Sequence, residues 1–75
     1  MYKILIVEDD ETIAGGLKNH LEKWNYQAEC MTDFKDVMGK FVEFEPQLVL
    51  LDIVLPFFNG FHWCQEIRKI SKVPI

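Results

Sequence analysis

Three carboxylates are the side chains best suited to chemistry in this 75-residue chain. Glu8 and Asp9 directly follow one apolar run, and Asp52 interrupts a second one after Leu51. A charged carboxylate in such a run is costly unless it is paired, hydrogen-bonded or used. Carboxylates that share one site repel each other, so they must take up protons or be neutralised by a hard cation. Oxygen ligands of this kind suit Mg²⁺, whereas the lack of His or Cys beside them disfavours zinc.

The segment after Asp52 adds to this site. Pro56 and Gly60 punctuate it in a pattern typical of a turn that feeds a helix. We expect a backbone carbonyl here, that of Val54, to supply another oxygen ligand. A carboxylate beside Mg²⁺ can also be a nucleophile, because the metal screens the oxygens of an incoming phosphoryl group. The residues are therefore compatible with formation of an aspartyl phosphate.

The order of the expected elements predicts how the carboxylates meet. Apolar strands over Tyr2–Val7, Tyr26–Met31 and Gln47–Asp52 alternate with amphipathic helices. This alternation predicts an α/β protein with a parallel sheet that is covered on both faces. If the first helix covers one face and the second the other, right-handed crossovers give the strand order 2-1-3. Ligands of such sheets bind beyond the carboxyl ends of the strands, where the chain reverses direction, and there the three carboxylates would meet.

Each of the three expected helices has a boundary signal and an apolar stripe. The boundary residues are Asp10 and Asn25 for the first helix, Thr32 or Asp33 and Pro46 for the second, and Asn59-Gly60 at the start of the third. The stripes, in the same order, are Ile13, Leu17, His20, Leu21 and Trp24; Phe34, Val37, Met38, Phe41 and Val42; and Phe61, Cys64 and Ile67, with Trp63 and Ile70 beside them. Val73–Ile75 is typical of the entry to a fourth strand.

Composition limits the classes of function. Hydrophobic residues make up 49% of the chain, so it is not a disordered tail. Asp plus Glu number 12 against 8 Lys plus Arg, and the net charge of −4 argues against nucleic-acid binding by this segment. Neither a membrane-spanning run nor a signal peptide is apparent, and Cys30 and Cys64 have no metal-binding spacing. We therefore expect one small cytoplasmic domain that does not engage a membrane.

The motifs resemble the receiver domain of bacterial two-component response regulators. Ile4–Asp10, Leu50–Pro56 and Gly60 carry the likeness, which extends over the whole chain. It implies a flavodoxin-like (CheY-like) doubly wound sheet with Asp52 as the phosphoacceptor. It also implies that the phosphodonor is a sensor histidine kinase, and that the chain is not an enzyme.

The same resemblance implies a set of Mg²⁺ ligands. Asp9 would bind the ion directly and Glu8 through water. Asp52 and the backbone carbonyl of Val54, two residues after the acceptor, would complete the protein ligands.

Other segments refine the resemblance and predict its extent. The Glu8–Asp10 start and the Ile67–Ile75 segment look like the OmpR/PhoB-type subclass, which binds DNA through a separate winged-helix domain. Phe61–Cys64 resembles regulators of cell-envelope and bacitracin-type antimicrobial-peptide resistance. A complete receiver has five β-α units, and residues 1–75 correspond to about three of them plus the start of a fourth strand. The family's Ser/Thr and Lys and its effector domain would lie outside the chain, and the open sheet edge would favour self-association.

Several alternatives stay open on the residues alone. A degenerate, non-phosphorylated interaction domain would use the same fold. A Mg²⁺-dependent phosphatase or nuclease would usually need a second Asp two residues after the first, where this chain has Glu11 and Val54. A flavin-type cofactor binder would need a phosphate loop, which the acidic run Glu8–Glu11 would repel. Phe57-Phe58 is either a contact for a partner kinase or a patch that packs under further residues.

Overall fold

The computed structural model describes all 75 residues, and its strands and helices alternate strictly. The elements are β1 (Lys3–Val7), α1 (Glu11–Lys23), β2 (Gln27–Cys30), α2 (Val37–Phe44), β3 (Leu48–Leu51) and α3 (Gly60–Arg68). The strands form one parallel sheet in the order β2-β1-β3. The predicted α/β class and the 2-1-3 order are therefore confirmed.

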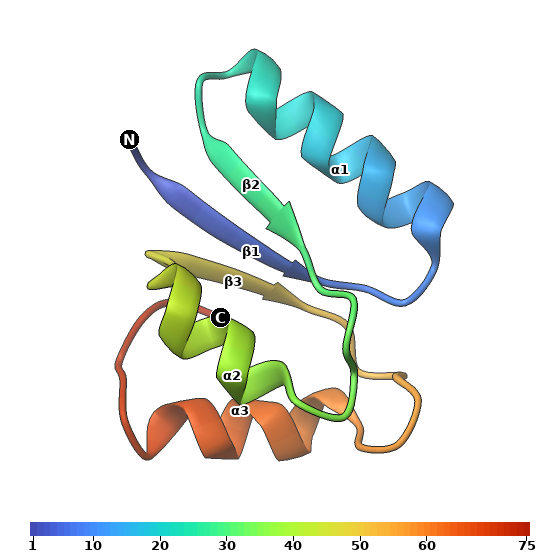
Figure 1. Ribbon diagram of the computed structural model, residues 1–75, viewed down its shortest axis with the longest axis vertical. Coiled ribbons are helices and arrows are strands. Elements are labelled where there is room, and N and C mark those ends of the chain that lie inside the picture. Colours follow the sequence, from blue (N-terminus) through green and yellow to red (C-terminus); the bar gives the residue numbers. More distant parts are fainter.

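β1 is the central strand, and it runs between two helical layers. Figure 1 shows α1 on one face of the sheet and α2 and α3 together on the other. Ile4 and Ile6 point to the α1 face and Leu5 and Val7 to the opposite face, and all four are buried. A strand that is apolar at every position is what burial on both faces requires.

The α1 face exposes side chains that the helical spacing predicts to be packed. Ala14 is the only buried residue of α1, whereas Ile13 and Trp24 are 52% and 67% exposed. Leu17 and His20 are exposed as well. The predicted stripe is wrong in these positions because α1 lies alone on its face of the sheet, with no second helix beside it to cover its flank.

α2 begins later than its sequence pattern predicts. Its N-cap is Asp36, whose Oδ1 accepts a hydrogen bond from the Gly39 amide at 3.0 Å, and not Thr32 or Asp33. Asp33 instead accepts from the amide of Lys35 at 3.0 Å and closes a turn that precedes the helix. The two capping sites lie only three residues apart, and the local turn decides between them.

The buried faces of α2 and α3 also differ from the predicted stripes in part. Val42 is 60% exposed, and Phe44 is buried in its place. The buried positions of α3 are Gly60, Trp63 and Ile67, whereas Phe61 and Ile70 are 62% and 60% exposed. Asn59 caps α3 as predicted, since its Oδ1 accepts from the His62 amide at 2.9 Å. The spacing of apolar residues thus predicted each helix correctly. Which of its side chains are buried depends on how the helix is rotated about its axis against the sheet.

Residues 73–75 lie beside β3 without forming a strand of their own. The Val49 amide donates to the Pro74 carbonyl at 2.9 Å, and the Arg68 guanidinium donates to the Val73 carbonyl at 2.8 Å. The predicted entry to a fourth strand is therefore limited to one ladder-type hydrogen bond. None of the helices combines the length and the apolar character needed to cross a bilayer.

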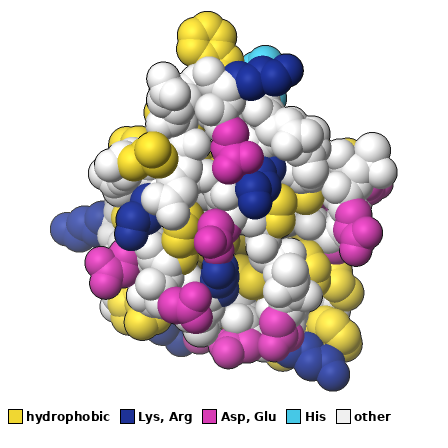
Figure 2. All heavy atoms as spheres, turned by 45° about the horizontal axis from the view of Figure 1, so that its top comes forward, with side chains coloured by type: hydrophobic (Ala, Val, Ile, Leu, Met, Phe, Trp, Pro, Cys, Tyr) yellow, Lys and Arg dark blue, Asp and Glu magenta, His cyan; other side chains and the backbone are white.

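Charged side chains of both signs are dispersed over the surface rather than segregated. Figure 2 shows acidic and basic groups interspersed on one face, with hydrophobic side chains exposed between them. No basic patch of the kind that binds nucleic-acid phosphates is visible on that face.

Candidate functional site

The carboxyl ends of β1 and β3 are joined at one edge of the sheet. Val7 and Leu51 are register partners, and the amide of Asp52 donates to the carbonyl of Val7 at 3.0 Å. The residues that follow Val7 are Glu8 and Asp9, so both acidic segments leave the sheet side by side. This pairing fixes the backbone on which the candidate site is built.

The three predicted carboxylates converge at this edge. One carboxylate oxygen each from Glu8, Asp9 and Asp52 lies within 4.8 Å of the others. Glu8 and Asp52 are half-buried and Asp9 is exposed. Residues far apart in the sequence are brought together here by the parallel pairing of β1 and β3.

The electrostatics of the cluster are visible in Glu8. The amide of Asp10 donates to Glu8 Oε1 at 3.1 Å, which by itself lowers the pKa of the carboxyl. Desolvation, a hydrogen bond shared with Asp52, and the negative charges of Asp52 and Asp9 act in the opposite direction. Together they raise the pKa of Glu8 above its ordinary value. A hard cation bound between these carboxylates would offset the repulsion that Asp52 and Asp9 exert on Glu8.

The other two acidic residues of the run have a different task. Asp10 Oδ1 accepts from the amides of Thr12 and Ile13 at 3.0 and 3.2 Å and thereby caps α1. Glu11 lies in the first turn of α1, where the helix dipole favours a negative charge. Neither belongs to the carboxylate cluster.

The loop between β3 and α3 closes tightly under Asp52. The amide of Val54 donates to Asp52 Oδ1 at 3.4 Å, and the amide of Gly60 donates to the carbonyl of Ile53 at 2.8 Å. A Cβ at Gly60 would lie 2.9 Å from the carbonyl carbon of Asp52 and closer still to its oxygen. Only glycine permits this approach. The sequence marked Gly60 by its spacing, but the contact itself has no local sequence signal.

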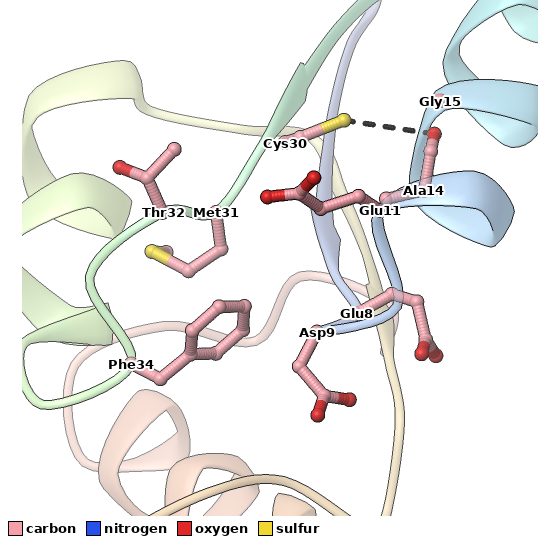
Figure 3. Close-up of a pocket in the computed structure, with 9 residues that line it drawn as sticks. All are labelled: Glu8, Asp9, Glu11, Ala14, Gly15, Cys30, Met31, Thr32 and Phe34. Atoms are coloured by element: carbon pink, nitrogen blue, oxygen red, sulfur yellow. Dashed lines mark hydrogen bonds between the residues drawn. The ribbon is translucent and has the colours of Figure 1, made fainter.

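A hollow of about 240 Å³ adjoins the cluster on the side of the loop after β2. Glu8 and Asp9 line it from one side and Phe34 from the other, and the Glu8 and Asp9 carboxylates turn away from that of Glu11 (Figure 3). Cys30 also lines it, with Sγ donating to the Ala14 carbonyl at 3.6 Å, and is not a member of the carboxylate set. The acidic cluster is thus reachable from solvent.

The fold and the site together define a class of protein. Parallel strands in the order 2-1-3 place acidic oxygens, and no His or Cys, at the point where the chain reverses direction. That donor set fits Mg²⁺ and not a thiolate- or imidazole-bound metal. The class is therefore a parallel α/β domain with an acidic, cation-binding type of cluster at the carboxyl ends of β1 and β3.

Residues 4–75 match the family model of the response regulator receiver domain, and the chain belongs to this family. The uncharacterized transcriptional regulatory protein YvcP of Bacillus subtilis is 53% identical over all 75 residues, which are 32% of its own length. The chain therefore spans about a third of the length of the curated relatives that it matches.

Solved structures agree with this assignment. The N-terminal domain of the nisin resistance regulator NsrR, a lantibiotic response regulator, gives a TM-score of 0.92 at 47% identity over 100% of this chain and 63% of that one. The complex of histidine kinase ThkA with response regulator TrrA gives a TM-score of 0.86 at 32% identity over 99% of this chain and 64% of the other. The predicted likeness to receivers, and within them to regulators of antimicrobial-peptide resistance, is confirmed. A further structure of TrrA, from Thermotoga maritima, is a complex with Mg²⁺-BeF, and receiver domains generally bind Mg²⁺ at an acidic pocket.

Proposed function

We propose that Asp52 is the phosphoacceptor of a two-component receiver and takes its phosphoryl group from a sensor histidine kinase. The observation that carries the proposal is the convergence of Asp52 with Glu8 and Asp9 within 4.8 Å at the joined ends of β1 and β3. Membership of the receiver family and the likeness to a regulator in complex with its histidine kinase support it.

In this proposal Glu8, Asp9, Asp52 and the Val54 carbonyl hold Mg²⁺. The ion would offset the repulsion that raises the pKa of Glu8 and screen the oxygens of the incoming phosphoryl group. Gly60 and the hydrogen bond from the Val54 amide orient the Asp52 carboxylate before the donor arrives.

The transfer itself is a single displacement at phosphorus. An Asp52 carboxylate oxygen forms the new O–P bond while the N–P bond of the kinase phosphohistidine breaks. The electron pair of that bond stays on the imidazole nitrogen, which is then neutral or takes a proton from solvent. The product is an aspartyl phosphate. Because the phosphoryl group remains on the chain, the domain is a substrate of the kinase rather than an enzyme with turnover of its own.

The remaining roles concern the protein that carries this domain. We propose that residues 1–75 form the N-terminal part of a receiver in a cytoplasmic transcription regulator, with DNA bound by an effector domain outside this segment. The names of the relatives as transcriptional and resistance regulators support this. We also propose that the isolated segment self-associates through the edge of β3 that faces away from β1. At that edge the Val49 amide donates one hydrogen bond to the Pro74 carbonyl, and no strand is paired with it.

Phosphoryl transfer from a purified kinase to the complete regulator tests the assignment of Asp52. Asp52→Ala should abolish acid-stable, hydroxylamine-sensitive labelling. Asp33→Ala, an exposed acid that lies outside the cluster, is the matched control and should be labelled normally. Labelling of the Asp52→Ala protein at another residue would contradict the assignment.

A ¹H–¹⁵N correlation spectrum with and without Mg²⁺ tests the metal ligands. We expect shift changes concentrated at Glu8, Asp9 and Asp52–Val54, and a smaller response in Glu8→Gln. Changes spread evenly over all acidic residues would mean that the ion is only a diffuse counter-ion.

A further inference from the structure

We infer that a groove between the ends of α2 and α3 is a contact surface for a second copy of this chain. The groove has a volume of about 350 Å³ and is lined by Phe41, Val42, Glu45, Pro46, Ile70 and Ser71. It is called the α2/α3 groove below. Its two walls, the end of α2 and the loop that follows α3, lie on the same side of the molecule in Figure 1.

The α2/α3 groove is separate from the carboxylate cluster and from the edge of β3. Pro46 precedes β3, whereas Asp52 follows the carboxyl end of that strand. No residue of β3 lines the groove. A contact here leaves the carboxylate cluster open to solvent, and the inference does not depend on the proposed phosphoacceptor role of Asp52.

The groove exposes apolar side chains that the fold leaves uncovered. Phe41 and Pro46 are buried and form its base. Val42 on the α2 wall and Ile70 on the α3 wall are each 60% exposed. Both belong to apolar groups that helical spacing predicts to be packed. Covering them with another protein surface would remove apolar area from water.

Charges of opposite sign stand on the two walls. Glu45 lines the α2 wall, and Lys72 directly follows Ser71 on the α3 wall. Both are exposed, and every ion pair within the chain uses other residues. In a twofold symmetric contact, residue i of one copy meets residue j of the other and the reverse. A twofold axis through the groove would therefore pair each Glu45 with the Lys72 of the second copy, so the surface is complementary in charge to itself.

The conformation of Glu45 supports a role for its side chain. Glu45 is the C-cap of α2 at φ 53°, in the left-handed region that favours glycine. Its amide donates to the Phe41 carbonyl at 3.0 Å, and the Lys3 ammonium donates to the adjacent Phe44 carbonyl at 3.0 Å. Because glycine would close this turn at a lower cost, the turn alone does not explain a carboxylate here, whereas a contact made by the side chain does.

The α3 wall is held in place by its own hydrogen bonds. The Ser71 amide donates to the Ile67 carbonyl at 2.9 Å. The Arg68 guanidinium donates to the Ser71 and Val73 carbonyls at 3.3 and 2.8 Å. Two fixed walls lose little conformational freedom on association. The surface offers few apolar side chains, so we expect a contact of the small, transient class, below about 1,200 Å² in total.

Association is measured by sedimentation equilibrium of the unphosphorylated complete regulator at concentrations up to about 1 mM. ¹H–¹⁵N spectra over the same concentration series locate the contact. Glu45→Lys and Lys72→Glu each set like charges against one another across the twofold axis, and the double variant restores opposite charges. Glu22→Lys is the matched control, since Glu22 is an exposed acid without an ion pair on α1, on the other face of the sheet.

We expect concentration-dependent shifts confined to residues 41–46 and 69–72. Each single variant should raise the dissociation constant by about tenfold, and the double variant should return it to within about threefold of the wild type. Glu22→Lys and Asp52→Ala should associate like the wild type, so a failure of the proposed function would not affect this test.

Three outcomes would overturn the inference. They are a wild-type protein that stays monomeric throughout, shifts that fall outside the groove, and a double variant that associates no better than the single ones. If the monomeric wild type showed shifts in the groove only after a sensor kinase was added, the groove would bind that protein instead of a second copy.

Discussion

The two faces of the sheet differ in how many apolar side chains they bury. The face under α2 and α3 holds nine buried residues, including Trp63 and Ile67, whereas the α1 face holds four, two of them alanines. Ala14 and Ala28 allow α1 to approach the sheet closely, but they bury little apolar area. The comparison teaches that most buried apolar surface lies on the α2/α3 face, while the carboxylate cluster lies at the ends of the strands that both faces share.

The largest difference between the faces should appear on truncation of Ile67. This side chain is fully buried on the α2/α3 face, so Ile67→Ala should lower the free energy of unfolding by about 2–5 kcal/mol. Leu17→Ala on the α1 face, where Leu17 is 38% exposed, should cost under about 1 kcal/mol. Urea unfolding followed by circular dichroism measures both. If Ile67→Ala does not fold, Ile67→Val at about 0.5–1.5 kcal/mol replaces it; equal losses on the two faces would refute the comparison.

Two glycines should respond with opposite signs. A Cβ at Gly60 would collide with the backbone of Asp52, so Gly60→Ala should cost about 1–3 kcal/mol and shift the loop between β3 and α3. Gly15 lies in α1 with nothing within 4 Å of such a Cβ, and Gly15→Ala should stabilise the protein by about 0.5–1 kcal/mol. Thermal unfolding of the two variants measures the pair. Destabilisation by Gly15→Ala would contradict the open space that the structure shows around Gly15.

The shared edge of the sheet should respond to pH and Mg²⁺. Since the pKa of Glu8 is raised in the folded state, the metal-free protein binds a proton more readily folded than unfolded. The stability of the metal-free protein should therefore increase as the pH falls through the raised pKa toward the ordinary value of 4.5, and decrease as the pH rises. Glu8→Gln should remove this dependence and stabilise the metal-free protein by under about 1 kcal/mol at neutral pH. Urea titrations between pH 4 and 8, with and without Mg²⁺, test this; a Glu8→Gln protein that is less stable than the wild type would contradict it.

The smallest effect is expected at the edge of the α2/α3 face. Lys40 of α2 pairs with Glu29 of β2, and the hydrogen bond that the Lys40 ammonium donates to the Glu29 carboxylate is the main reason that the pKa of Lys40 is raised. Stability from a raised Lys pKa is present below 10.5 and is lost as the pH rises through the folded value. The partners are 28% and 37% exposed, so Lys40→Met should cost no more than about 0.5 kcal/mol. A loss above 1 kcal/mol in chemical unfolding would show that the pair is more than a surface contact.

Much of the fold followed from local pattern. The strand–helix alternation, the 2-1-3 order, the caps Asp10 and Asn59 and the likeness to receivers were all predictable from the sequence. These features depend on side-chain period and on the handedness of crossovers, which neighbouring residues specify. The convergence of Asp52 with Glu8 and Asp9 follows directly from that topology.

What only the tertiary structure decided concerns which surfaces are covered and which atoms meet. Exposure of Trp24 and Phe61, both in stripes predicted to be packed, depends on the elements lying beside α1 and α3 and not on helical spacing. The raised pKa of Glu8 and the placement of Lys35 over Phe57 join segments remote in sequence, and the approach of Gly60 to Asp52 depends on how the loop between them closes. A sequence specifies period and chirality locally, but contacts between distant segments exist only once the chain has packed, because their distances depend on every element between them.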